Sequence, residues 1–451
     1  MIQAEQEARE SSLISRKTFK RSGHLIFVGT VLSDDIEDQL ARFYKETDSK
    51  EPLLFDFEQA EFIDIPALVN CIATLVQRKE NNLETFLGYP KAKKARDFLD
   101  VWRFAEAVNR ATKTPFELFL LPEDYHYLAE QQEAYRGVGD GIDALEYNPD
   151  WNENPNTKRN FFEFTTFSSG KHDVMQTEPL FAAPRNESKR WTGALIRQVL
   201  MKHLGSEKPK DDIARVIIYE AISNAVRHPK ARIIQVVSHF ARKAIRDDEV
   251  NTKRTSMEAE KKKIEGSLRI CVWDDGDSIP STLLNVLKAG KNVRAFRFPL
   301  YMYDAIHVRV RNFEGAKLRE IVVNQSEDLT AASTEARVLL SSLYPGISRT
   351  VDDQVPAVEP YENAAPEEPN LYLDWMPGMG LYSLTKTVLD QYQGSLFIRS
   401  GNYRLLMEMA HDAYRVQFNV HYKCTITAYP EVFPGFRGNL ITIKLPIKGI
   451  T

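Results

Sequence analysis

Cysteine is scarce in this chain of 451 residues, which has three: Cys71, Cys271 and Cys424. They lie far apart in apolar segments, and this spacing indicates neither a disulfide framework nor a zinc site. Long apolar runs are lacking too, because no stretch reaches the roughly 20 residues that a membrane helix requires. The polar start MIQAEQEARESS is unlike a signal peptide. We therefore expect a cytoplasmic protein with no membrane partner.

An excess of charge of one sign is also missing. The formal net charge is −4 and the pI about 6.2. The basic clusters, such as Lys91 to Arg96 and Lys261 to Lys263, are local. This charge balance does not indicate the basic surface that binds nucleic acid, so we expect no nucleic-acid partner. The length predicts two or three domains with ample core.

The first motif, YEAISNAVRH, lies in a run from Asp211 to His228 whose apolar residues recur at helical spacing. That spacing places Glu220 and Asn224 one turn apart on one face. A carboxylate and a carboxamide so arranged can serve one metal-bound triphosphate, the Glu deprotonating a nucleophile and the Asn oxygen meeting Mg²⁺. The alternative is a polar stripe on an amphipathic surface helix.

The second motif, LRICVWDDGDSIP, is an apolar strand that runs into acids, a Gly and a Pro-initiated helix. Acids at a strand end face a cleft. Asp274 can accept a hydrogen bond from an adenine amino group, Gly276 lets the backbone approach the ring, and Ile279 offers an apolar wall. A plain strand-turn-helix connection capped by Asp explains the same letters.

The third motif, PGMGLYSLTKTVLDQYQG, places a Gly-rich turn before a helix predicted from Leu381 to about Tyr392 and closed by Gly394. Free backbone amides at such a helix start bind phosphate. The alternative is an ordinary tight turn.

The order of these motifs, followed by a terminal strand GNLITIKLP, resembles the GHKL, or Bergerat-fold, ATPase superfamily over roughly residues 156 to 451. The resemblance implies an α/β (α+β) sandwich with ATP between helices and a mixed sheet, and a Mg²⁺ cofactor. It implies roles for Glu220 as general base, Asn224 as magnesium ligand, Asp274 as adenine-recognition acid, Gly276 as the first Gly of D-x-G-x-G, Gly378 and Gly380 as phosphate-lid glycines before Leu381, and Thr442 in the adenine-side water network. Ser278 departs from the pattern, where the family has a second Gly.

After a tail over residues 1–20, residues 21–120 predict a small α/β domain. Its expected strands and helices are His24 to Thr30, Asp34 to Tyr44, Leu53 to Phe57, Pro66 to Arg78 and Leu83 to Gly88. The pattern LLFDFEQAEFIDIPALVNCIATL resembles the STAS domain of anti-sigma-factor antagonists. That family carries a phosphorylated Ser beside the Asp, whereas the turn here reads Asp64-Ile65-Pro66-Ala67. Without a hydroxyl, the module is expected to serve docking or oligomerisation; a generic α/β module is the alternative.

Three further segments of the chain lie between or within these two predicted domains, and the longest of them is described last. Residues 121–155 are expected to be a linker with some helix from Tyr125 to Tyr135. Residues 241–266 predict a charged, solvated insertion between strands Ile233 to Phe240 and Leu268 to Trp273.

The segment of residues 291–377 is far longer than an ATPase lid needs. Within it, Ser333 to Leu343 has helical apolar spacing, and MYDAIHVRVR fits a helix or a strand. Asp352 to Asn370 is acidic and Pro-rich, a composition that opposes regular structure. We expect this lid to be ordered by the γ-phosphate. The alternative is a family-specific insertion that is structural or binds a partner.

Three functions fit these motifs. The first is a Mg²⁺-dependent ATPase acting as a nucleotide-driven switch on a protein partner. The second is a serine kinase of the anti-sigma-factor type, and the third a non-hydrolysing ATP-sensing scaffold. A sensor histidine kinase fits less well, because no H-E-x-x-x-P-like helix precedes the pocket motifs. A homodimer is expected from the resemblance alone.

Overall fold

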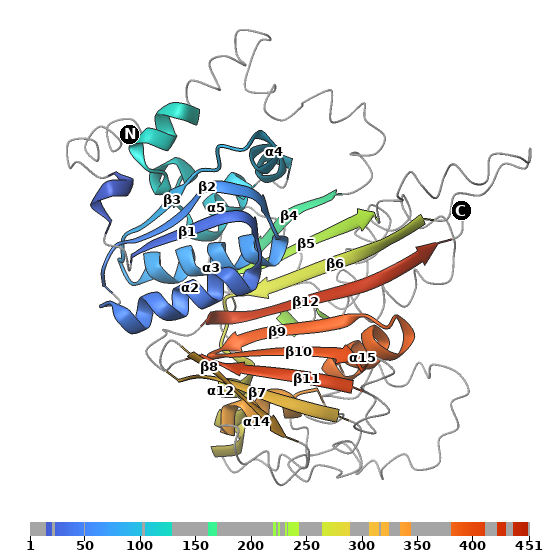
Figure 1. Ribbon diagram of the computed structural model, residues 1–451. Coiled ribbons are helices and arrows are strands. Elements are labelled where there is room, and N and C mark those ends of the chain that lie inside the picture. The colour runs from blue at the N-terminus through green and yellow to red at the C-terminus, as the bar shows by residue number, and fades with distance from the viewer. Residues whose placement is uncertain are drawn as a thin grey trace, which may run out of the picture.

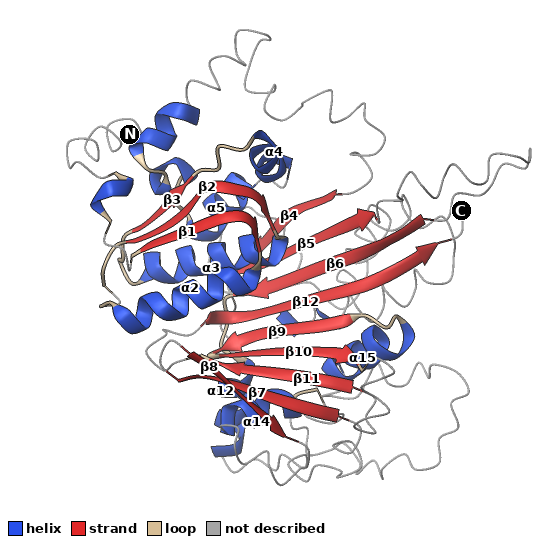
Figure 2. Cartoon of the chain, viewed as in Figure 1, coloured by secondary structure: helices blue, strands red, loops and turns tan. Residues whose placement is uncertain are grey.

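The chain forms a mixed α/β structure with two sheets (Figures 1 and 2). The computed structural model describes residues 15–19, 23–48, 50–101, 104–128, 161–168, 220–221, 224–225, 231, 233–242, 264–288, 306–314, 317–323, 334–343, 380–410, 422–429 and 436–449. Within this part of the chain, no helix is long and apolar enough to cross a membrane.

The N-terminal domain is built on a parallel sheet in the order β1-β2-β3. Its elements are η1 (Arg16–Thr18), β1 (His24–Val31), α2 (Ser33–Glu46), β2 (Leu53–Ile63), α3 (Ile65–Glu80), β3 (Thr85–Gly88), α4 (Lys93–Val101), α5 (Phe104–Thr112) and η2 (Phe116–Phe119). The predicted strands and helices all exist; β2 continues past the predicted Phe57 to Ile63, and the other ends shift by one or two residues. Residues 122–128 are helical, and Tyr125 and Leu128 pack on this domain, so it extends into the predicted linker.

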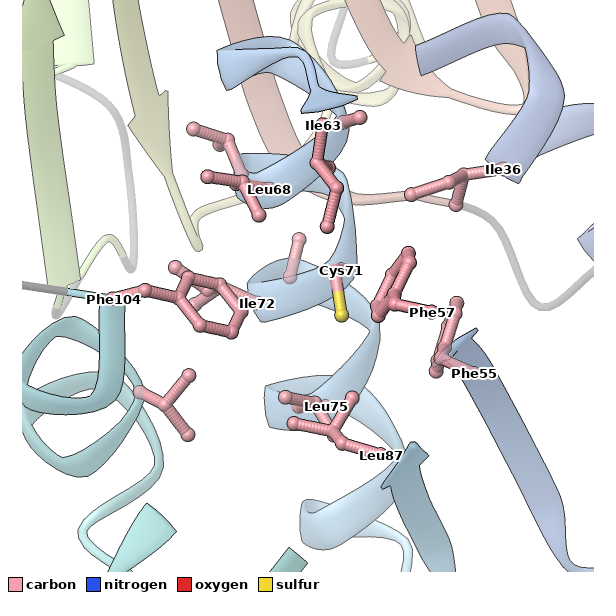
Figure 3. Packing of buried hydrophobic residues seen from close by; sticks show 14 of the residues in the cluster. Ile36, Phe55, Phe57, Ile63, Leu68, Cys71, Ile72, Leu75, Leu87 and Phe104 are labelled. Atoms are coloured by element: carbon pink, nitrogen blue, oxygen red, sulfur yellow. The ribbon is translucent and has the colours of Figure 1, made fainter. Parts of the chain in front are cut away.

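Helix α3 is the centre of the N-terminal core. The Asp64 carboxylate accepts a hydrogen bond from the Ile65 amide at its start, and Pro66 lies in its first turn. Cys71, Ile72 and Leu75 of α3 lie among apolar side chains from β2, β3 and α5 (Figure 3). The helix is buried on nearly all sides because it lies between the small sheet and a larger one.

The larger sheet is mixed, and in the described residues its order is β4-β5-β6-β12-β9-β10-β11-β7-β8. Its pairs are antiparallel except β11 with β7. The strands are β4 (Phe161–Ser168), β5 (Ile233–Arg242), β6 (Ile264–Asp274), β7 (Ile306–Glu314), β8 (Lys317–Val323), β9 (Ser395–Gly401), β10 (Tyr403–Met409), β11 (Tyr422–Ala428) and β12 (Phe436–Gly449).

Each face of this sheet is covered by a different layer. Alternate side chains such as Ile270, Ile398 and Ile443 pack in one core with four helical elements. These are α12 (Ile279–Lys288), α14 (Thr334–Ser341), α15 (Gly380–Lys386) and η8 (Thr387–Gln391), the last two being continuous. The intervening side chains, including Trp273 and Leu440, belong to the core of the N-terminal domain. We call these the helix face and the outer face.

The structure corrects the prediction that residues 291–377 form a lid. The described parts of this segment are β7, β8 and α14. The sequence MYDAIHVRVR, which fitted a helix or a strand, contributes to strand β7. The helix predicted from Ser333 is confirmed as α14. Strand β7 pairs with β11 inside the sheet, and Val308 and Leu339 are core residues. Much of this segment is therefore part of the domain core, while Asp352 to Asn370 lies outside the described residues. Strands β5 and β6 likewise run a few residues into the predicted insertion, of which residues 243–263 lie outside the description.

Candidate functional site

The first part of the site is a close contact between the Glu220 helix and the start of α15. Residues 220, 221, 224 and 225 are helical, with Ala221 and Ala225 buried in the helix-face core. A Cβ atom built on Gly380 would lie 2.4 Å from Glu220 Oε2 and 3.5 Å from Asn224 Oδ1. The two polar side chains therefore converge on one point of the backbone, which only glycine leaves open.

Asn224 is oriented in a way that suits a cation ligand. Its Nδ2 is buried and has no hydrogen-bond partner among the described residues, while Oδ1 points toward Gly380. An amide oxygen and a carboxylate oxygen at one place are the hard donors that Mg²⁺ prefers. The residues present therefore fit this ion. In the described part of the chain, no cluster of three or more His, Cys, Asp or Glu side chains forms a separate metal site.

The second part of the site is a cross-strand row at the end of β6. Asn439 on β12 lies opposite Asp274 on one side and Ser400 of β9 on the other. The Asn439 amide nitrogen lies 3.2 Å from both carboxylate oxygens of Asp274. The Ser400 hydroxyl donates to Asn439 Oδ1 at 2.5 Å. All three side chains are buried and face the helix layer, because they alternate with residues of the outer face.

Asn439 also holds the loop that follows β6. Its amide nitrogen donates to the Asp277 carbonyl at 3.1 Å, and its oxygen accepts from the Ile279 amide at 3.1 Å. The Gly276 amide donates to Asp274 Oδ1 at 2.9 Å. Burial raises the pKa of Asp274 well above its ordinary value, although the Gly276 and Asn439 hydrogen bonds oppose that shift. The carboxyl group is thus fixed in plane by hydrogen bonds from Gly276 and Asn439.

A glycine brings β12 close enough for this arrangement. Gly438 has φ +78°, and a Cβ there would lie 1.6 Å from the Asp274 carbonyl oxygen. The β12 to β9 register shifts between Phe436 and Asn439, which marks a bulge at this point. Sequence reasoning missed both Asn439 and Ser400. The signal that was available is the Gly-Asn pair that opens the last strand.

Ser278, which departs from the family pattern, has a structural role here. Its hydroxyl accepts from the Ser281 amide at 3.2 Å and its carbonyl from the Thr282 amide at 2.9 Å, so it caps α12. Ile279, the predicted apolar wall, is partly buried and packs on the helix-face core.

Thr442 does not lie where it was expected. Its hydroxyl contacts Cys271 Sγ at 3.5 Å, and Thr442 alternates with the helix-face residues Ile441 and Ile443. Period-two alternation therefore puts Thr442 on the outer face, away from Asp274. Asn439, three residues earlier, takes the position beside the acid.

The remaining predicted residues divide into two groups. Leu381 is partly buried and packs against the helix-face core next to Gly380. Gly378 lies outside the described residues.

The structure thus brings Glu220, Asn224 and Gly380 together and places Asp274 on the same face of the sheet. A carboxylate, a carboxamide and a buried polar cluster share one layer. Comparisons of the chain with protein-family models, with curated proteins and with solved structures find no match.

Proposed function

We propose that the C-terminal part of the chain is a GHKL-type ATP-binding domain that hydrolyses ATP with Mg²⁺, and that it acts as a nucleotide-driven switch. The observation that carries this proposal is the convergence of Glu220 and Asn224 on Gly380. These residues come from motifs about 160 positions apart in sequence, and the sequence pattern alone predicts that both serve one triphosphate. The helix-over-mixed-sheet layers support the Bergerat arrangement.

Glu220 is proposed to orient and deprotonate the attacking water. It is half-buried, and its Oε2 points at the start of the helical run Gly380–Gln391, where phosphate is expected to bind. A positioned general base of this kind contributes about 10²- to 10⁴-fold to a rate. Asn224 is proposed to hold Mg²⁺ through Oδ1. The ion supplies neutralisation of charge on the phosphate oxygens when it is bound.

Asp274 is proposed to accept the adenine amino group. Asn439 fixes the carboxylate plane from the neighbouring strand, so the acceptor is set before the base arrives. Gly276, which is buried beside it, leaves room for the ring because it has no side chain.

The N-terminal domain is proposed to be a STAS-like module, on the strength of its parallel sheet and its α3 start. Asp64, in the turn where that family carries its phosphoacceptor, contacts Arg269 on the outer face of the large sheet. Glu220 belongs to the helix face, so the sheet separates it from this turn. That separation favours water over a residue of this turn as the nucleophile.

Hydrolysis is tested by phosphate release from the purified protein with Mg²⁺ and ATP. We expect Glu220→Gln to abolish release while calorimetry still detects binding of a non-hydrolysable ATP analogue. Transfer of label from γ-labelled ATP to a co-purified protein would show that the protein is a kinase and not a hydrolase. Binding of ATP without turnover would favour the ATP-sensing scaffold. Folded wild-type protein that binds no analogue would overturn all three.

A further inference from the structure

The outer face of the large sheet meets the N-terminal domain through opposite charges. Arg269 of β6 pairs with Asp64 at 2.6 Å. Arg404 of β10 pairs with Asp34 at the exposed rim. Three basic side chains of the sheet thus face three acids of the N-terminal domain, the central pair being Arg399 and Glu37.

That central pair is fully buried, with 0% exposure for both side chains. Arg399 Nε lies 3.1 Å from Glu37 Oε1, which also accepts from Asn70 Nδ2 at 3.0 Å. The Tyr429 hydroxyl donates to Glu37 Oε2, and its ring lies 4.3 Å from the Arg399 guanidinium carbon. Glu37 belongs to α2, so this helix is held on the sheet by a charge with no access to water. Such a pair tolerates little movement, because a separated buried charge is costly.

The pair lies next to the candidate nucleotide site along the strands. Asp274, Asn439 and Ser400 form one row across β6, β12 and β9, which we call the site row. The adjacent row across the same strands is Trp273, Leu440 and Arg399, which we call the docking row. Consecutive residues of a strand point to opposite faces, so the site row faces the helices and the docking row faces the N-terminal domain.

We propose that docking of the N-terminal domain and nucleotide binding are linked through these two rows, each favouring the other. This inference rests on the proposed function. Asp274 is held in plane by Asn439, which is held by Ser400, the residue after Arg399. A docked Glu37 fixes Arg399 and with it the site row, so the bound nucleotide meets a preorganised acceptor. Because linkage is reciprocal, the nucleotide strengthens docking by the same factor.

The test uses the full-length chain with Glu37→Gln, which keeps the side-chain shape and removes the buried charge. The control is Asp34→Asn, which removes a charge from the same interface at its rim, where the side chain is 53% exposed. Calorimetry with Mg²⁺ and the non-hydrolysable ATP analogue measures Kd. We expect Glu37→Gln to raise Kd by at least about 5-fold, the lower end of typical coupling, and Asp34→Asn to leave it within about 2-fold.

Hydrogen exchange on the wild type gives an independent readout. The analogue should slow exchange of the buried amides of α2, which does not touch the proposed site. Should Glu37→Gln fail to fold, Tyr429→Phe removes one bond to Glu37 and keeps the ring over Arg399. Unchanged Kd in a folded variant, together with unchanged exchange in α2, would overturn the linkage while leaving ATP binding in place. A wild type that binds no analogue would overturn the proposed function, and the linkage with it.

Discussion

The contact between Gly380 and Glu220 gives the sharpest prediction, and its perturbation is Gly380→Ala. The added methyl would lie 2.4 Å from Glu220 Oε2, whereas ordinary contact begins at 3.4 Å. The carboxylate is the far end of a flexible side chain, so it can withdraw by about 1 Å while the backbone stays in place. A misplacement of about 1 Å at a reacting group costs on the order of 10²-fold in rate.

We therefore expect Gly380→Ala to lower kcat for ATP about 100-fold. Affinity for the non-hydrolysable analogue should change far less, because Asp274 and its partners are untouched. The free energy of unfolding should hold or rise by up to about 1 kcal/mol, since Ala restricts the unfolded chain and Gly380 does not have positive φ. Steady-state phosphate release, calorimetry and chemical denaturation measure the three quantities.

The control is the same substitution in a Glu220→Gln background. If the methyl acts by displacing the Glu220 carboxylate, the double variant should be about as slow as Glu220→Gln alone, because the two changes disable one group. The reasoning would be refuted if the losses of kcat in the two single variants multiplied in the double variant. It would also be refuted if Gly380→Ala kept the wild-type kcat.

Three further predictions concern the row around Asp274. Asp274→Asn should raise the Kd for the ATP analogue by about 10-fold or more, since its new amide opposes the Asn439 amide; Asp277→Asn in the same loop is the matched control, and equal effects on Kd would contradict the assignment. Asn439→Ala should lower the free energy of unfolding by about 1–3 kcal/mol in urea denaturation, because it removes hydrogen-bond partners of the buried Asp274 carboxyl and Ser400 hydroxyl; unchanged stability would count against this network. Gly438→Ala should cost at least about 2 kcal/mol or prevent folding, through strain at positive φ and a clash with the Asp274 carbonyl; a thermal midpoint equal to that of the wild type would show that the close approach is not needed.

Local sequence patterns predicted much of the fold. Apolar spacing predicted α2 and α3, because burial on one face repeats with the period of a helix, and the Gly-rich turn marked the start of the helix after Gly380. Asp274 was correctly placed at the end of β6 because the apolar run stops there.

Long-range features were harder to predict. Nothing in the sequence near Asn439 or Ser400 indicates that β12 pairs with β6 or that β9 pairs with β12, since strand order depends on distant pairing. Thr442 was misplaced because the register of β12, fixed by the bulge after Gly438, decides which of its residues face the helices. The β7 and β8 strands were taken for a lid because the segment that holds them is longer than a bare ATPase core needs. The partner of β7 in the sheet, β11, lies more than a hundred residues later.

The position of the N-terminal domain could not be predicted either. Glu37 and Arg399 are separated by 362 residues, and each is an ordinary charged residue in its own element. Only the folded arrangement shows that they form a buried pair. The N-terminal module was expected to serve docking or oligomerisation, and its turn at Asp64 contacts Arg269 of the large sheet within the same chain.

The central claim is that Glu220, Asn224, Gly380 and Asp274 surround one ATP. The most direct measurement is a crystal structure of the Glu220→Gln protein with Mg²⁺ and ATP. We predict the adenine amino group within hydrogen-bond distance of the Asp274 carboxylate, the triphosphate against Gly380, and Mg²⁺ on Asn224 Oδ1. Nucleotide bound at another surface, or its absence from crystals grown at saturating concentration, would contradict the account.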